Sequence, residues 1–381
     1  MLFANRSDNQ RPFPTSGLEG KSFSGKLPFH NCNLKTAASK LTEKKVRWFY
    51  SKRNRTSAFS TRLSVGGNEP NPYRKKFNQG ATIVPRSVYF VDIAQEIPSD
   101  FENRVINVRT SAITREDAKL PWRNIDLKGR IESNFLFRTA LSRSILPFTF
   151  FDPSLVVLPV IIDVRDDGHK IVTLHSAADL RQKGFLHASR WFVNAERIWE
   201  ANKTDKAKTM SNVGRLDFQR GLTEQDLNQP YLVLFTKSAK DANAVLCRRE
   251  ALDFEFIADY VTYVFYTREI NEAFYLTAIL NSEGINSLIK DFQTRGLFGA
   301  RDVTKKILDV YFPRFDRENP THSSLANLSE KAHEAANAFI RTSPSSGKIT
   351  PGKLGRLRGG IKDHLKAEMK EIDDLVVKII K

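Results

Sequence analysis

The chain has 381 residues, of which 40 % are hydrophobic, enough apolar material for a sizeable core in more than one structural unit. No apolar run approaches the roughly 20 residues that span a bilayer, and the N-terminus lacks the apolar stretch of a secretory signal. Two cysteines, Cys32 and Cys247, exclude a disulfide framework and a zinc site made of cysteine alone. We therefore expect a cytoplasmic protein with no membrane partner.

The formal net charge of +17 is concentrated near the N-terminus. Residues 1–86 contain 17 Lys and Arg against 4 Asp and Glu, a balance of +13, whereas the other 295 residues hold 43 basic and 39 acidic groups, a balance of +4. A local basic segment suits a polyanion, because each neutralised phosphate releases counterions. The same composition is typical of a solubilising tail, so charge alone leaves both interpretations open. An anionic membrane surface is a weaker third fit, since no amphipathic anchor accompanies the charge.

Residues 1–75 are expected to form a basic, partly disordered extension or linker, with one short helix near 36–50. Within it, Trp48, Phe49 and Tyr50 stand among lysines and arginines. These aromatic side chains suit base stacking beside phosphate contacts. They also suit a hydrophobic clip that docks the segment on the body, which is the favoured interpretation.

Residues 76–268 have the pattern of a β-rich unit. Apolar alternation and β-branched residues predict strands over 81–84, 88–91, 104–110, 231–235, 244–247 and 260–266. Residues 131–141 fit either a short helix or a strand. A β-hairpin is predicted from 156–164 and 170–174, with Asp167-Gly168 in its turn. Residues 176–201 are helical in period, with Trp191, Ala195 and Trp199 on one side.

From residue 269 the pattern becomes helical. Residues 269–341 are predicted to be the helical part of the same unit, and Asn281-Ser282 to end one of its helices. Residues 342–381 form a hinge and a last helix whose apolar side is Ile361, Leu365, Met369, Ile372, Val376 and Ile379. The predicted fold class is therefore α+β, with a mixed, mostly antiparallel sheet over roughly 77–268 followed by a helical C-terminal part.

Several short sequence blocks follow one another along residues 72–380. They include FNQGATIVPR at 77–86, LPW at 120–122, IDLKGRIE at 125–132, RLDF at 215–218, YLTAILNS at 275–282 and GLFGAR at 296–301. Each block alone has low specificity, and what is informative is that the blocks occur together and in this order. Together they resemble the C-terminal target-recognition region of N6-adenine DNA methyltransferases, especially fused type IIG restriction-modification enzymes and BREX-like methylases.

The resemblance implies a module that recognises a short sequence in double-stranded DNA. Arg side chains suit guanine edges in the major groove and Asn or Gln suit adenine, while Lys and Arg hold phosphates. The DNA contacts expected on this basis are Arg86, Arg109, Arg123, Arg130, Arg215, Arg295, Arg301, Lys305, Arg356 and Arg358. Other interpretations stay open for several of them: an ordinary edge arginine at Arg86, an ion pair of Arg215 with Asp217 on a turn, a helix C-cap at 296–299 that leaves Arg301 solvated, and a solvated helix face that begins with Arg356 and Arg358.

The reaction centre of such enzymes is missing from the sequence. An S-adenosylmethionine site needs a Gly-rich loop after a Rossmann strand, and the adenine pocket needs an Asn/Asp-Pro-Pro-Tyr/Phe loop. The nearest string, NEPNPY at 68–73, has one proline too few before the aromatic residue and lies where the family has a linker. We expect no catalytic residue, cofactor or metal in this chain. S-adenosylmethionine is expected only in a partner methyltransferase domain.

The expected partners are double-stranded DNA and a separate methyltransferase subunit, and the expected location is the cytoplasm, associated with the nucleoid. The chain is not expected to be catalytic alone. Two alternatives remain: a methyltransferase subunit whose cofactor and adenine loops have diverged, and a regulator that mimics the recognition region in order to sequester a methyltransferase.

Overall fold

The computed structural model describes residues 17–53, 56–60, 69–94, 104–296, 299–342 and 349–380. The predicted α+β class with a helical C-terminal part is confirmed. The prediction of one sheet over 77–268 is wrong, because this region contributes to two larger sheets, of five and four strands. Every strand ladder among the described residues is antiparallel, and the parallel contacts are two isolated bridges, Ala81 with Asp259 and Arg138 with Phe256.

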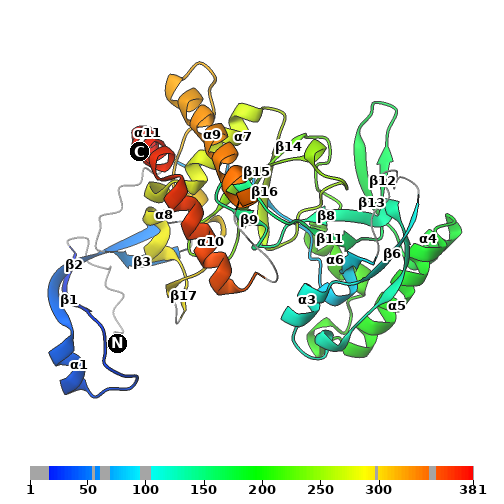
Figure 1. The fold of residues 1–381 in the computed structure, drawn as a ribbon, viewed down its shortest axis with the longest axis horizontal. Coiled ribbons are helices and arrows are strands. Elements are labelled where there is room, and N and C mark those ends of the chain that lie inside the picture. Colours follow the sequence, from blue (N-terminus) through cyan, green and yellow to red (C-terminus); the bar gives the residue numbers. More distant parts are fainter. Residues whose placement is uncertain are drawn as a thin grey trace, which may run out of the picture.

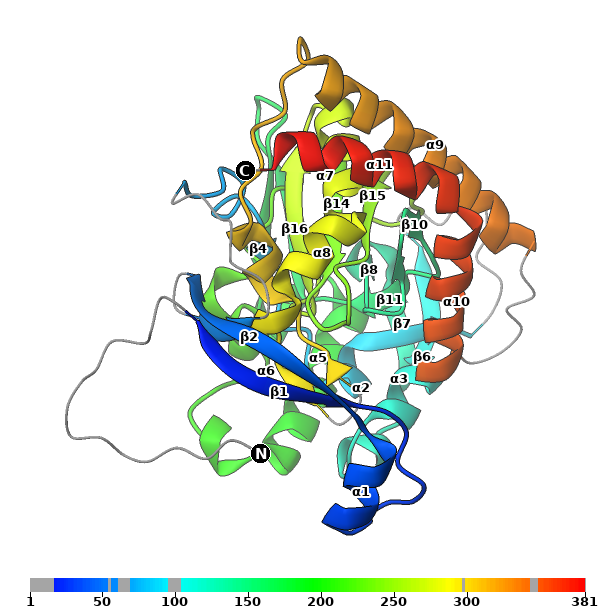
Figure 2. The same cartoon turned by 90° about the vertical axis from the view of Figure 1, so that its left-hand side faces the viewer.

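An arm of residues 18–50, here called the basic arm, projects from the body (blue in Figures 1 and 2). It contains β1 (Leu18–Ser24), α1 (Leu34–Lys40) and most of β2 (Thr42–Arg53), which pairs with both β1 and β3 (Thr56–Ser60). The predicted helix near 36–50 ends at Lys40. From Thr42 the polar and apolar residues alternate and the aromatic residues favour a strand. None of residues 18–50 is buried.

Two aromatic residues of β2, Trp48 and Tyr50, contact the neighbouring strands β1 and β3. A Cβ on Gly20 would lie 3.1 Å from the ring of Trp48, and Tyr50 meets Phe59 of β3 edge to face at 5.7 Å. The link to the body is made further along, where Ser60 Oγ donates to Asp291 Oδ2 at 2.6 Å.

The five-stranded sheet has the order β7-β6-β5-β11-β8. Its strands are β5 (Phe90–Ile93), β6 (Val105–Thr110), β7 (Lys128–Glu132), β8 (Leu136–Thr139) and β11 (Ser154–Val157). Helices α4 (Ala177–Gln182) and α5 (Leu186–Asn202) lie beside it (Figure 1). The predicted hairpin is confirmed as β12 (Val160–Val164) and β13 (Lys170–Leu174).

The four-stranded sheet has the order β15-β14-β16-β4 and supports the C-terminal helices. Its strands are β4 (Asn78–Gln79), β14 (Tyr231–Thr236), β15 (Ala244–Arg248) and β16 (Thr262–Thr267). The helices are α7 (Ile270–Asn281), α8 (Glu283–Ile289), α9 (Pro320–Thr342), α10 (Pro351–His364) and α11 (Lys366–Ile379).

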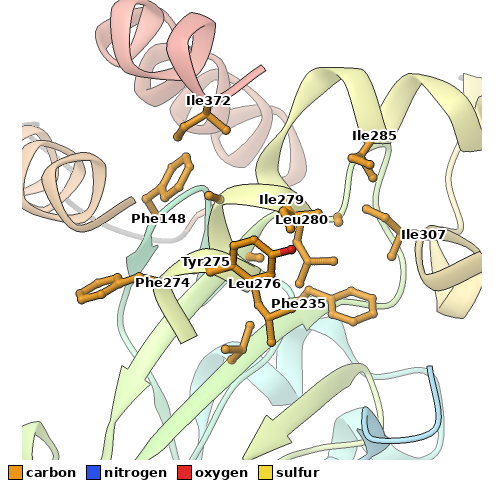
Figure 3. Close-up of a cluster of buried hydrophobic side chains, with 14 of the residues drawn as sticks. Phe148, Phe235, Phe274, Tyr275, Leu276, Ile279, Leu280, Ile285, Ile307 and Ile372 are labelled. Carbon is orange, nitrogen blue, oxygen red and sulfur yellow. The ribbon is translucent and has the colours of Figure 1, made fainter. Parts of the chain in front are cut away.

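One apolar core joins this sheet to the helices (Figure 3), so the boundary expected at 268/269 lies inside a shared core. Phe235 of β14, Tyr275 of α7 and Ile372 of α11 all belong to it. The single last helix predicted from its apolar side is two helices. They join at Leu365, which is fully buried and has φ −93° and ψ 20°, outside the helical range.

The strand predicted over 81–84 is reduced to one bridge at Ala81. Pro85 has no N–H for a ladder and instead takes the N-cap of α2 (Arg86–Tyr89), so the strand begins only at Phe90. Gly80 passes very close to another segment, since a Cβ there would lie 2.1 Å from the carbonyl oxygen of Ala258. The remaining short helices used below are α3 (Ala112–Asp117), η1 (Trp122–Asn124) and α6 (Asn212–Leu216).

Candidate nucleic-acid interface

The edge ribbon formed by β6 and β7 brings two of the predicted DNA contacts together. Along β6 the residues alternate between buried and exposed, and Asn107 and Arg109 are exposed. The register pairs Asn107 with Arg130 and Arg109 with Lys128. Residues paired across an antiparallel ladder share one face of the sheet. The exposed face of this ribbon, here called the ribbon face, therefore carries Asn107, Arg109, Lys128 and Arg130.

The ribbon is fixed to helix α5 at two places, Gly129 on the opposite face and Glu132 at the end of β7. A Cβ on Gly129 would lie 3.5 Å from the ring of Trp191. The carboxylate of Glu132 accepts hydrogen bonds from the backbone N–H groups of His187 and Ala188, at 3.0 and 2.8 Å. A carboxylate in this position satisfies donors of the first turn and complements the helix dipole. These contacts anchor the ribbon on α5.

The acidic side chains near the ribbon face already interact with other groups of the protein. Asp92, opposite Arg109 in the register with β5, accepts from the backbone N–H of Ala112 at 2.9 Å. Asp126 contacts Arg115 at 3.3 Å and Lys128 at 3.6 Å. In the described part of the chain no ion pair occupies Arg109 or Arg130. Arg123, on η1 before β7, is exposed and its Nε donates to the carbonyl of Ala118 at 2.9 Å.

Two adjoining cavities lie beside the end of this sheet, and both are lined by Arg215 and Tyr260. The larger measures about 660 Å³ and contains Arg86, while the smaller measures about 500 Å³. The guanidinium of Arg215 lies over the ring of Trp199 at 5.8 Å.

The alternative pairing of Arg215 with Asp217 is wrong. The Asp217 carboxylate instead accepts from the backbone N–H groups of Leu222 and Thr223 and from the Thr223 hydroxyl, each at 2.9 Å. It closes the turn that carries the RLDF block.

Arg86 is half-buried beside an acid that the sequence pattern did not single out. Its Nη2 lies 3.8 Å from Oδ1 of Asp259, and its guanidinium lies 5.6 Å from the centre of the Phe90 ring. Burial raises the pKa of Asp259 to about 7, although Arg86, the backbone N–H of Val261 and Lys237 all lower it. No local motif marks Asp259, because its proximity to Arg86 depends on a long-range contact.

The predicted contacts of the helical side are dispersed. Arg295 lies in β17 (Arg295–Gly296), which pairs with β18 (Gly299–Ala300), so the GLFGAR block is a small hairpin rather than a helix C-cap. Residues 297–298 and the side chain of Arg295 lie outside the described residues. Arg301 is exposed, and its Nε lies 3.5 Å from the Asp302 carboxylate.

Two further candidates make contacts within the protein. Lys305 lies over the Tyr263 ring at 5.7 Å, and burial together with Arg74 lowers its pKa. Arg358 of α10 is half-buried, and its Nη2 donates to the carbonyls of Ser142 at 2.5 Å and Ile145 at 3.0 Å. Burial lowers the pKa of Arg358 to about 10. Arg356, two residues earlier, is exposed. Arg358 therefore ties α10 to the segment before β9 (Ile145–Leu146).

No protein-family model matches the chain, and no curated protein matches it. Among the described residues, no cluster of His, Cys, Asp and Glu is suited to hold a metal ion. The helices in the same ranges are all too short or too polar to cross a membrane.

The ribbon face is the place where two of the predicted DNA contacts, Arg109 and Arg130, come together. Its other two members, Asn107 and Lys128, were not among the contacts predicted from the sequence. The alternation along 104–110 already placed Asn107 beside Arg109.

Proposed function

We propose that this chain is a double-stranded DNA recognition module of an adenine DNA methyltransferase or restriction-modification system, and that the ribbon face reads the bases. The observation that carries the proposal is the register of β6 with β7, which sets Asn107 against Arg130 and Arg109 against Lys128 on one exposed face. The major groove of B-DNA admits a two-stranded β-ribbon. Arg pairs with the O6 and N7 atoms of guanine, and Asn with the N6 and N7 atoms of adenine.

The basic arm supplies the electrostatic part of this proposal. It contains seven Lys and Arg against two Glu, on a projection in which no residue is buried. Contacts from such side chains to phosphates increase affinity and position the protein without reading sequence. Arg123 and Arg301, both exposed, are further candidates for phosphate contact.

The link to adenine methylation is supported by the ordered sequence blocks. Three of them have a local structural role: Gly80 passes the Ala258 carbonyl, Asp217 closes a turn and Asn281 bonds the backbone of Ala244. The proposed catalytic domain, with its S-adenosylmethionine site, belongs to a partner. The chain would then fix where that partner acts.

A selection from a random-sequence duplex library, at two salt concentrations, tests the proposal. We expect the wild type to enrich one short motif that survives the higher salt concentration. The double variant Arg109→Ala/Arg130→Ala should lose that enrichment, since each base contact contributes about 1–3 kcal/mol of discrimination. Arg165→Ala, which removes an exposed arginine from the turn between β12 and β13, is the matched control. Enrichment of no motif, or of the same motif by the double variant, would refute base reading by the ribbon face.

A further inference from the structure

The larger cavity beside the five-stranded sheet has the size of a small-molecule site. Its volume of about 660 Å³ lies in the usual range of ligand pockets, about 300–1,000 Å³. It is hollowed between α2, α3, η1 and α5, and its wall combines cations and the carboxylate of Asp117 with aromatic rings. The members that matter here are Arg86, Lys119, Trp122, Arg143, Trp199 and Lys203.

Two arginines of this wall have unsatisfied donors. The Nε atoms of Arg86 and Arg143 are buried, and neither has a hydrogen-bond partner among the described residues. Arg143 Nη2 donates to Ser154 Oγ at 3.1 Å, and Arg86 reaches Asp259 only at 3.8 Å. A buried N–H group without an acceptor is costly and rare. The guanidiniums of Arg86 and Arg143 are therefore incompletely paired within the protein, beside a cavity with room for an acceptor of their other N–H groups.

The charge of Arg86 also acts on the guanidinium of Arg143. Burial lowers the pKa of Arg143, and the positive charge of Arg86 lowers it further, whereas Asp152 and Asp117 raise it. An anion placed between two guanidiniums relieves their repulsion and accepts charge-assisted hydrogen bonds. Phosphate oxygens are acceptors of this kind. Lys119, exposed at the cavity's edge, adds to the positive field.

The aromatic part of the wall suits a planar ring. Trp122 is half-buried and stacks on Trp199, with ring centroids 6.0 Å apart and an interplanar angle of 28°. Trp199 is 4 % exposed, and its Nε1 donates to the carbonyl of Met210 at 2.8 Å, so this ring is fixed. A nucleobase stacked on Trp122 would extend an existing aromatic stack.

We infer that this cavity binds a nucleotide, with its phosphate held by Arg86 and Arg143 and its base stacked on Trp122. The inference does not depend on base reading by the ribbon face. The nucleotide has two possible sources with the same chemistry, either a free mononucleotide or an unpaired nucleotide within DNA.

Calorimetric titration of the full chain with AMP, inorganic phosphate and adenosine tests the site. We expect AMP to bind more tightly than either fragment. Arg143→Met should raise the Kd for AMP and for phosphate by roughly ten- to a hundredfold, as expected for a lost charged hydrogen bond. Trp122→Leu should raise the Kd for AMP by about tenfold and leave that for phosphate unchanged. Arg165→Met, outside the cavity, should change nothing.

Arg143 also bonds Ser154, so its variant needs a check of folding by circular dichroism. Lys119→Met provides a second test at an exposed position and should weaken phosphate binding several-fold. Binding of AMP that is no tighter than adenosine, or that survives all three cavity variants in folded protein, would overturn the inference. The pair Arg109→Ala/Arg130→Ala should bind AMP normally, which separates this site from the ribbon face.

A duplex with one unpaired adenosine, compared with the fully paired duplex, identifies the source once AMP binding is established. Tighter binding of the unpaired form by the wild type, lost in Arg143→Met, assigns the site to a nucleotide presented by DNA. Equal binding of the two duplexes assigns the site to a free nucleotide.

Discussion

The side chain of Asn281 forms two hydrogen bonds with the backbone of Ala244. The Ala244 N–H donates to Oδ1 at 2.9 Å, and Nδ2 donates to the Ala244 carbonyl at 2.8 Å. Asn281 is the last residue of α7, and Ala244 is the first residue of the edge strand β15. The amide thus takes the place of a neighbouring strand and joins the helical layer to the sheet.

Replacing this amide should destabilise the fold. Asn281→Ala leaves the buried N–H of Ala244 without a partner, while the carbonyl keeps a hydrogen bond from Phe148 at 3.0 Å. We expect the free energy of unfolding to fall by about 1–3 kcal/mol, as measured by urea denaturation. Asn327→Ala, at an exposed position of α9, should change it by less than about 0.5 kcal/mol. Equal effects of the two substitutions would show that the hydrogen bonds do not stabilise the fold.

The close approach at Gly80 gives a second prediction. In Gly80→Ala the new methyl group would meet the Ala258 carbonyl, so backbone must move, and we expect a loss of stability of about 1–3 kcal/mol. Gly355→Ala in α10 has open space around its Cβ and should gain up to about 1 kcal/mol from helix propensity. Thermal unfolding of both variants checks the pair. A Gly80→Ala variant as stable as wild type would mean that the two segments separate at no cost.

Local patterns predicted the elements that short-range physics determines. The alternation at 104–110 gave β6, and the Asp-Gly turn gave the hairpin of β12 and β13. The same patterns gave wrong or incomplete predictions where the role of a residue depends on a segment that is distant in the sequence. Arg358 reads as a basic residue among glycines, yet its role is set by the carbonyls of Ser142 and Ile145, more than 200 positions earlier. The convergence of Arg109 with Arg130 likewise required the register between two strands.

Asp259 should make stability depend on pH. Burial raises its pKa to about 7, whereas an Asp in the unfolded chain titrates near about 3.9. Between these values the folded protein keeps a proton that the unfolded chain has released. Its contribution to stability is therefore fully present below about pH 4 and is lost as the pH rises towards 7.

We expect Asp259→Asn to gain stability relative to wild type across this window, by up to about 1.4 kcal/mol per pH unit, and to hold a constant difference above it. Urea denaturation in steps of about half a pH unit, from about pH 4.5 to about pH 8.5, measures that difference. The exposed Asn327→Ala variant, which changes no titrating group, should give a flat difference. A flat difference for Asp259→Asn as well would show that this carboxyl titrates normally.

The basic arm should control the salt dependence of DNA binding. Neutralising Lys40, Lys44 and Lys45, all exposed, removes up to three phosphate contacts. We expect the slope of log K against log salt to become shallower by about 2–3, at about 0.9 per contact. The selected motif should not change. Binding of one duplex across a salt series measures the slope, and the exposed Lys331, Lys366 and Lys370 of α9 and α11 provide the control triple. An unchanged slope for the arm triple would remove the arm from the interface.

The segment before Gly80 has a consequence for how the chain is made. Tyr73 lies in the core with the C-terminal helices, where its hydroxyl accepts from the backbone N–H of Phe315, and Gln79 pairs with Tyr263. At 5–20 residues per second, a ribosome needs roughly 10 to 50 seconds to reach these partners. Tyr73 therefore emerges well before Phe315, and during that interval it lacks the core contacts that cover it in the folded chain.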